Sequence, residues 1–321
     1  MTTGPELTFP LVPRFRLVGL AFGGIHSTRR GVGSDVAGSR PYQPWDHLWS
    51  IDWAASARVS SARGTDEFIV RERFAEEAPR VVIVADRRPA MRLYPAEFPW
   101  LSKPEALATA AGLIAASAFR VRGTVGYLDF ANVAHPDPAE RSAEPFWRPP
   151  GSQAGLNRAV ARDIAWEVFH APEDNLARAF DHLFHVRRSL TPGTFVFVLS
   201  DFLEPPPTDA WLRALEHRWD VVPVVIQDPT WEQSFPDVHS IAVPLWDAAT
   251  GELGTLRLSQ REARERRERN ERRLADLLGD FGRLELEPLL LSGSGPEQVL
   301  EPFLAWAERR LFLSGQWRHA V

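Results

Sequence analysis

The alternation of apolar and polar positions predicts a sheet built around two strands that each end in aspartate. Val81–Ala85 is a continuous apolar run rich in β-branched residues, and Asp86 follows it directly. Thr194–Asp201 has the same form and also ends on an acid. A short apolar run of this kind is typical of a strand that is covered on both faces, as in a parallel sheet. Because open α/β sheets bind ligands at the carboxyl ends of their strands, we expect Asp86 and Asp201 to meet at one edge, at a binding site.

The remaining pattern predicts strands and helices in alternation along most of the chain. Lys103–Val121 is rich in alanine and predicts a helix, and Gly123–Phe130 after it predicts a buried strand. A strand, a helix and a strand at this spacing indicate parallel neighbours joined by a right-handed crossover. A half-exposed edge strand is expected at Glu67–Phe74. Together with the two strands given in the next sentence, this makes six predicted strands. The other expected elements are strands at Asp220–Gln227 and Arg283–Leu291, and helices at Glu173–Ser189, Asp209–Arg218, Ser259–Gly279 and Pro296–Phe312.

We therefore expect an α/β fold with a doubly wound, mostly parallel sheet over residues 79–321. Residues 1–78 are expected to form an N-terminal arm of loops and short extended pieces, because glycine, proline and tryptophan are mixed through Ile25–Arg58 without a helical period. Residues 131–171 are interpreted as an irregular insert. Residues 228–258 are interpreted as a β-hairpin appended to the sheet, with its turn near Asp247–Gly251.

Composition excludes several classes of site and surface. The chain has 321 residues, a net charge of −5 and no cysteine, which excludes disulfides, thiolate metal sites and a cysteine nucleophile. The acidic balance gives no overall basic footprint for nucleic acid, and binding through the arginine- and glutamate-rich Ser259–Arg273 stays a minor alternative. No apolar run approaches the roughly 20 residues that span a bilayer, so we expect no membrane insertion and a cytoplasmic protein. Nothing in the pattern indicates an oligomeric state.

The segment Arg40–Arg58 reads RPYQPWDHLWSIDWAASAR and carries the most specific pattern in the chain. It resembles the motif R-x-Y-x-P-G-D-D-x-R-x-I-D-W-x-x-S-A-R of a bacterial family known as domain of unknown function 58. The resemblance implies a von Willebrand factor A-like α/β domain. It also implies a MoxR-type AAA+ ATPase as the partner, with this chain as its adaptor or assembly factor. The matching residues are Arg40, Tyr42, Pro44, Asp46, Ile51, Asp52, Trp53, Ser56, Ala57 and Arg58.

This motif segment is also a candidate interaction surface. Its tryptophans recur at every fourth position, and they either pin the segment onto the sheet or form an exposed recognition surface. The second interpretation follows from the prominence of tryptophan and arginine in interaction hot spots. Its charged side chains are expected to form ion pairs. The candidate interaction residues are Arg40, Tyr42, Asp46, Asp52, Trp53 and Arg58.

A von Willebrand factor A-like domain usually carries a magnesium site whose first element is D-x-S-x-S after the first strand. The resemblance places Asp86 at the start of this element, but Arg88 and Ala90 stand where the two serines would be. We therefore expect no cofactor, and an ion pair of Arg88 with Asp86 or Asp201 in place of the metal. Magnesium held by the two aspartates and water is the alternative, since Mg²⁺ keeps several waters in protein sites.

Enzyme motifs are missing from the sequence, which has no G-x-S-x-G, Walker A or H-E-x-x-H pattern. His182 and His185 are spaced i,i+3 on an expected helix, and without further ligands they indicate packing rather than a metal site. The expected function is a non-enzymatic protein-interaction module. The alternative is a metal-dependent hydrolase that uses Asp86 and Asp201.

Overall fold

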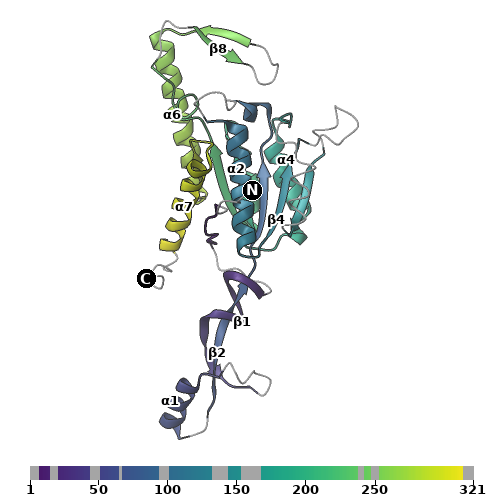
Figure 1. The fold of residues 1–321 in the computed structure, drawn as a ribbon, viewed down its shortest axis with the longest axis vertical. Helices are drawn as coiled ribbons and strands as arrows, with labels where there is room; N and C mark the ends of the chain where they lie inside the picture. Colours follow the sequence, from purple (N-terminus) through teal and green to yellow (C-terminus); the bar gives the residue numbers. More distant parts are fainter. Residues whose placement is uncertain are drawn as a thin grey trace, which may run out of the picture.

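The computed structural model describes residues 7–14, 21–43, 51–64, 67–93, 101–131, 144–152, 168–237, 242–246 and 253–313. Its central strands are β3 (Arg80–Ala85), β4 (Thr124–Asp129), β5 (Phe146–Gly151), β6 (Phe195–Ser200), β7 (Asp220–Ile226) and β10 (Leu289–Leu291). In the described part of the chain they form a six-stranded sheet in the order β10-β7-β6-β3-β4-β5 (Figure 1). All neighbours are parallel except β4 and β5. The predicted α/β fold with a mostly parallel sheet is confirmed.

Helices cover both faces of this sheet. One face carries α2 (Lys103–Arg120) and α7 (Pro296–Leu313), and the other carries α4 (Asn175–His185), α5 (Thr208–Glu216) and the last turns of α6 (Gln260–Arg283). Alternate residues of β3 serve the two layers, because Val81 and Ile83 belong to the core under α2 whereas Val82 and Val84 belong to the core under α4. Burial on both faces explains why the strands read as continuous apolar runs.

The predicted unit of strand, helix and strand is confirmed, because α2 joins the parallel neighbours β3 and β4. Short 3₁₀ turns follow β3 and α4, at η2 (Pro89–Arg92) and η3 (Arg187–Ser189). The last strand is shorter than predicted. Helix α6 continues to Arg283, so only Leu289–Leu291 remain to pair with β7.

A long arm leaves the sheet at the amino end of β3. It consists of the antiparallel strands β1 (Ala21–Pro41) and β2 (Ile69–Glu77), with helix α1 (Trp53–Arg63) at the far end (Figure 1). The strand predicted at Glu67–Phe74 exists, but its place at the edge of the central sheet is wrong because it pairs with β1. Helix α1 was not predicted either. Ser56 is its one buried residue, so no apolar stripe marked it as a helix.

Strand β5 takes the edge position that had been assigned to Glu67–Phe74. It lies inside the interval 131–171, which the sequence indicated to be irregular, and it runs antiparallel to β4. The strand was not predicted because it contains Pro149 and Pro150, and proline within a segment usually argues against a strand. An edge strand tolerates proline since one side of it needs no hydrogen bonds.

The first described residues belong to the core of the α/β domain, although the sequence had assigned them to the arm. Phe9 and Leu11 are buried in the cluster under α2 and α7, and the Phe9 ring lies 4.6 Å from that of Phe303 between centroids. The Phe9 amide donates a hydrogen bond to Ser117 Oγ at 3.0 Å. The carbonyl of Val12 accepts one from Arg310 Nη1 at 2.9 Å. The arm proper therefore begins after this segment.

The predicted hairpin is present as β8 (Ala242–Trp246) and β9 (Leu253–Arg257), which pair antiparallel. It forms a two-stranded sheet of its own and is not part of the central sheet, so the expectation of an appended hairpin is wrong in that respect. Its predicted turn near Asp247–Gly251 lies outside the described residues. The hairpin leads into α6, which begins with a capping box between Ser259 and Glu262. Among the described helices, none is long and apolar enough to cross a membrane.

Candidate functional site

The two strand-end aspartates meet at the carboxyl edge of the central sheet, as the sequence predicted. β3 and β6 are neighbours in parallel register, and both Asp86 and Asp201 are fully buried. Arg88 lies between them, with Nη2 at 2.7 Å from Asp86 Oδ2 and 2.8 Å from Asp201 Oδ1. Its Nε also donates a hydrogen bond to Asp86 Oδ2, at 3.0 Å. The predicted ion pair of Arg88 is confirmed, and it bridges both carboxylates at once.

Asp86 has no oxygen left for an external ligand. Ser200 Oγ donates a hydrogen bond to Oδ2 at 2.6 Å, and Asn175 Nδ2 donates to Oδ1 at 3.1 Å. The backbone amide of Arg88 also donates to Oδ1, at 3.0 Å. Neutral donors and the guanidinium together satisfy a buried carboxylate, which would otherwise be costly to keep charged.

Asp201 is paired with a second buried cation, Lys103, at the first residue of α2. Lys103 Nζ lies 2.8 Å from Asp201 Oδ2 and 2.5 Å from Glu232 Oε1. The lysine is 0% exposed, and Glu232 reaches it from the loop that follows β7. No role was assigned to Glu232 from the sequence, and Lys103 was identified only as the start of a helix. The signal that could have found Lys103 is that it is the single lysine in a chain with many arginines.

The charges of this network reinforce one another. Burial alone lowers the pKa of Lys103, but the carboxylates of Asp201 and Glu232 outweigh it and raise that pKa. Burial alone raises the pKa of Asp201, but Lys103 and Arg88 outweigh it and lower that pKa. Burial raises the pKa of Glu232, although Lys103 opposes the rise. Arg88 likewise has a raised pKa, because Asp86 and Asp201 outweigh its burial. The group is therefore a set of internal ion pairs.

These residues do not fit a divalent cation. Magnesium requires oxygen ligands in near-octahedral geometry, and both oxygens of each aspartate already accept hydrogen bonds. The guanidinium of Arg88 and the ammonium of Lys103 supply the positive charge that a metal would bring. In the described ranges, no cluster of three or more His, Cys, Asp or Glu side chains is placed to hold a metal.

A second buried ion pair lies at the end of the neighbouring strand β4. Arg87 Nη1 is 3.5 Å from Asp129 Oδ2, and the hydroxyl of Tyr127 donates to the same oxygen at 2.8 Å. Arg87 also donates two hydrogen bonds to the carbonyl of Val168, at 2.6 and 3.0 Å. Burial raises the pKa of Asp129, with Arg87 opposing the rise. This pair fastens the chain around Val168 to the sheet edge, and the sequence did not predict it.

At the other end of the molecule, the motif segment is held together by two of its polar residues. Asp52 caps α1, since its Oδ1 accepts a hydrogen bond from the amide of Ala55 at 3.0 Å. Ser56 Oγ donates to the Asp52 carbonyl at 2.7 Å and accepts from the Ile69 amide at 2.8 Å. These contacts join α1 to β2, so Asp52 and Ser56 have structural roles here.

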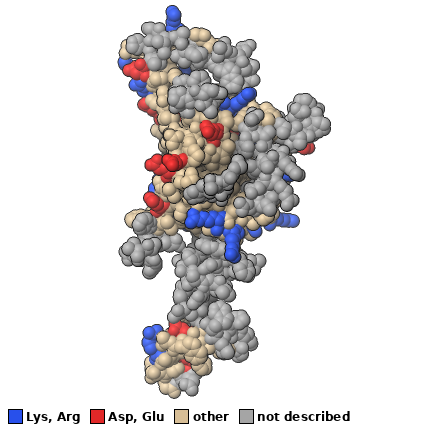
Figure 2. Space-filling model, in the orientation of Figure 1, with Lys and Arg blue, Asp and Glu red and all other residues tan. Residues whose placement is uncertain are grey.

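Three aromatic residues lie around the start of α1 and form what we call the arm tip: Tyr42, Trp53 and Phe68. Trp53 is 63% exposed and Phe68 is 47% exposed. The two rings pack edge to face at 5.9 Å between centroids, and Tyr42 packs against Phe68 at 6.4 Å. Arg58 lies farther along α1 and is exposed. Figure 2 shows that the described surface of the arm end is mainly uncharged, with charged side chains at its margin.

The remaining motif predictions fall partly outside the described residues. Asp46 is not described, and Arg40 is described by its backbone alone, which pairs with Val70. Their predicted ion pairs thus stay predictions. The two candidate surfaces are also far apart along the fold. The arm leaves at the amino end of β3, whereas Asp86 follows its carboxyl end (Figure 1).

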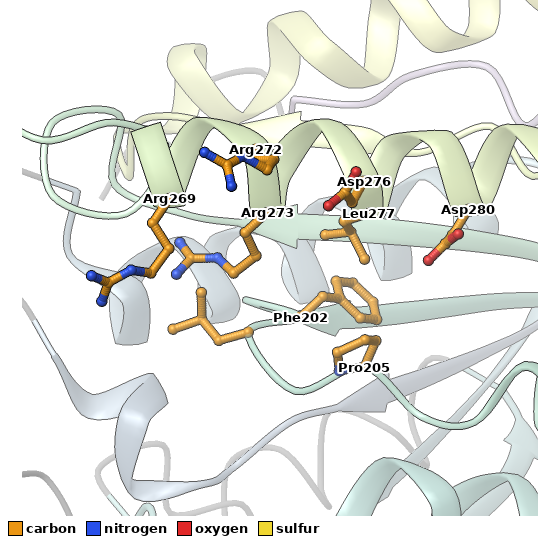
Figure 3. A pocket seen from close by; sticks show the side chains of 9 residues that line it. Phe202, Pro205, Arg269, Arg272, Arg273, Asp276, Leu277 and Asp280 are labelled. Carbon is orange, nitrogen blue, oxygen red and sulfur yellow. The ribbon is translucent and has the colours of Figure 1, made fainter. Parts of the chain in front are cut away.

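A groove of about 350 Å³ opens beside the carboxyl edge and was not predicted. One wall is the turn after β6, with Phe202, Leu203 and Pro205, and the other is α6 (Figure 3). Phe202 has a φ of 49°, a left-handed conformation that a residue with a bulky side chain rarely adopts. Its amide bonds to Ser200 Oγ at 3.0 Å, and the Leu203 amide bonds to Asp201 Oδ1 at 3.0 Å. The ion-pair edge therefore fixes this wall of the groove.

Comparison with known proteins gives a family and two distant structural likenesses. The family described as "Protein of unknown function DUF58" matches residues 38–275. The conserved hypothetical protein BatB from Bacteroides thetaiotaomicron has a TM-score of 0.40 and 14% identity, covering 72% of this chain and 99% of that one. An uncharacterized membrane spanning protein from Vibrio fischeri has a TM-score of 0.19 and 9% identity, covering 72% and 96%. Both TM-scores are too low to support an argument. No curated protein matches the sequence.

Proposed function

We propose that this chain, which belongs to the DUF58 family of proteins of unknown function, is a non-enzymatic protein-interaction module. The family membership confirms the resemblance of Arg40–Arg58. The observation that carries the proposal is the arm tip, where a capped helix holds Trp53 63% exposed. Trp and Arg are the residues most enriched in interaction hot spots, and exposed aromatic clusters mark binding surfaces. The arm tip is the proposed contact with the partner.

The proposed partner is a MoxR-type AAA+ ATPase, and this chain is its adaptor in the assembly or remodelling of another protein complex. This part of the proposal rests on the family resemblance alone, as does a von Willebrand factor A-like assignment of the α/β domain. The exposed arm suits an adaptor, because it presents its tip well away from the central sheet (Figure 1). The partner can then dock without disturbing the sheet or its buried ion pairs.

The contacts at the carboxyl edge disfavour the metal-dependent hydrolase. A general acid or base must reach the proton that it transfers, and Asp86 and Asp201 are fully buried and paired with internal cations. We expect Mg²⁺ and Mn²⁺ to leave the melting temperature of the protein unchanged. Metal binding that disappears in Asp86→Ala would restore the hydrolase as the better proposal.

The interaction module is tested by affinity purification of the tagged protein from its native host, with partners identified by mass spectrometry. The variant is Trp53→Ala/Phe68→Ala, which removes the exposed aromatic rings of the arm tip. The matched control is Phe312→Ala, which removes a ring that is 76% exposed on α7. We expect the wild type and the control to recover an AAA+ ATPase in a nucleotide-dependent manner, and the arm-tip variant to lose it.

Two results would count against the proposal. Equal recovery of the ATPase by the arm-tip variant would remove the arm tip from the interface. Recovery of no stoichiometric partner by the wild type would remove the adaptor role itself. Circular dichroism checks that both variants remain folded, which we expect because each of the mutated side chains is about half exposed or more.

A further inference from the structure

The groove between the turn after β6 and α6 has the features of a peptide-binding site. Its α6 wall presents Arg269, Arg272 and Asp276, which follow one another at three- and four-residue spacing and therefore lie along one face of the helix. Figure 3 shows the arginines toward one end of the groove and Asp276 and Asp280 toward the other. The charges are thus separated along the length of the groove.

The arginines at one end are available to a ligand. Arg269 and Arg272 are both exposed, and in the described part of the chain neither forms an ion pair or a hydrogen bond through its side chain. Arg273 is different, because its Nη2 donates to the carbonyl of Glu232 at 2.5 Å and holds α6 to that loop. An anionic group seated at this end would meet two unpaired guanidinium groups, each able to form a forked hydrogen bond.

The opposite end is acidic, and the wall that faces α6 is apolar. Asp276 is exposed and has no ion pair within the described ranges, whereas Asp280 is paired with Arg283. On the wall formed by the turn after β6, Leu203 is half-buried and Pro205 is exposed, whereas Phe202 and Leu277 are almost completely buried. Successive side chains of an extended chain point to opposite sides, so an apolar side chain can cover this wall while the charged side chains before and after it face α6.

The size of the groove sets the length of the occupant. From Arg269 to Asp276 is seven residues of helix, or about 10 Å along the axis. An extended chain advances about 3.3 Å per residue, so this span matches about three residues. The order of side chains that complements the wall is acidic, apolar and basic.

We propose that this groove binds an extended segment of a partner protein that carries an acidic, an apolar and a basic residue in that order along the groove. The acidic residue pairs with Arg269 and Arg272, the apolar residue covers Leu203 and Pro205, and the basic residue pairs with Asp276. This inference rests on the proposed function, since it assumes that the ligand is a protein. Nucleic acid is the poorer occupant, because its continuous negative charge would be repelled by the acidic end.

The experiment is a selection of a randomised octapeptide display library on the full-length protein. The test variant is Arg269→Glu/Arg272→Glu, and the matched control is Arg264→Glu/Arg309→Glu, which makes the same change in net charge at exposed arginines outside the groove. We expect wild type and control to enrich the acidic, apolar and basic order. The affinity of the selected peptides for the test variant should be lower than their affinity for the wild type by a factor of about ten or more.

A second variant, Asp276→Arg, examines the other end and keeps the test independent of the first. It should replace the basic residue of the enriched peptides with an acidic one and leave the rest of the motif unchanged. Failure to enrich any motif, enrichment without an acidic residue, or unchanged binding to Arg269→Glu/Arg272→Glu would each overturn the proposal. So would binding of a single-stranded oligonucleotide at this groove as tight as that of the peptides.

The outcome for the groove is separate from that for the arm tip. Trp53→Ala/Phe68→Ala leaves the groove intact, so it should select the same peptides as the wild type. If the arm-tip variant loses the ATPase but the library yields no motif, the proposed function survives and the groove proposal fails. If the library yields the motif but the wild type recovers no ATPase, the groove proposal survives and the proposed adaptor function fails.

Discussion

The carboxyl edge of the sheet and the arm tip differ in how far their candidate functional residues are buried and paired. At the edge, Asp86, Arg88 and Asp201 are almost completely buried and are bound to one another. At the arm tip, Asp52 and Ser56 fix the local backbone, and Trp53 remains 63% exposed. The edge has the position of a ligand site without an open ligand group, and the arm tip has exposed groups without any recognisable catalytic chemistry.

This difference shows that the position of a residue in a fold is a weak guide to its role. Strand-end aspartates of α/β sheets are expected to face a ligand, yet here internal cations satisfy them. Ion pairs of this kind cost much to break, because removal of one partner leaves an uncompensated buried charge. The edge is therefore a structural element whose sensitivity to mutation should be high, whereas that of the arm tip should be low.

The largest expected effect is that of Lys103→Met, which keeps the buried stem and removes the ammonium. Glu232 then loses its buried cation and Asp201 keeps only Arg88, so the free energy of unfolding should fall by about 3–5 kcal/mol. Urea denaturation followed by circular dichroism measures the loss. The control is Arg261→Met, which breaks an exposed ion pair with Glu265 and should change stability little. Similar losses in unfolding free energy for the two variants would show that the ion pairs at the carboxyl edge stabilise the protein no more than an exposed ion pair does.

A smaller effect is expected at the far end of the arm from Ser56→Ala. The variant removes a hydrogen bond to the Asp52 carbonyl and leaves the Ile69 amide without its acceptor, at a cost of about 1–3 kcal/mol. Hydrogen exchange should accelerate in α1 and β2 and stay unchanged in the central sheet. Ser61→Ala, an exposed serine on the same helix, is the control. Acceleration throughout the sheet would mean that the arm and the sheet unfold as one unit.

The pH dependence sharpens the contrast further. The folded pKa of Lys103 lies above its ordinary value of 10.5, so its contribution to stability is complete below that value and is lost as pH rises toward the folded pKa. The folded pKa of Asp201 lies below 3.8, so its contribution is complete above that value and is lost as pH falls. The difference in unfolding free energy between wild type and Lys103→Met should therefore shrink above about pH 10.5. A difference that grows there would show that Lys103 is not held as a cation.

The smallest expected effect on stability is that of Trp53→Ala, within about 0.5 kcal/mol, because the ring is mostly in solvent. Thermal unfolding measures it. Trp306→Ala is the matched control, since that ring projects from α7 into the core, is fully buried, and should cost about 3–5 kcal/mol when it is removed. A large loss for Trp53→Ala would indicate that the arm tip is a packing element rather than a binding surface.

The sequence predicted what depends on local pattern. The apolar runs of β3 and β6 placed Asp86 and Asp201 at one edge, and the arginine two residues after Asp86 indicated the ion pair. The role of Glu232 was not predicted, because it reaches Lys103 from a loop 129 residues farther along the chain and no local pattern encodes such a contact. Helix α1 was not predicted for a different reason. Its apolar residues form no buried stripe, and a capping aspartate alone did not distinguish a helix from a turn.

The position of Lys103 has a practical consequence for labelling and proteomics. It is the one lysine of the chain, and it is 0% exposed, so the folded protein offers no accessible ε-amino group to an amine-directed reagent. Lysine cross-linkers, succinimidyl esters and lysine-specific proteases should therefore leave this side chain untouched in the native molecule. Modification of Lys103 becomes a count of molecules in which the carboxyl edge of the sheet has opened. One side chain thus serves as a built-in probe of opening at this edge.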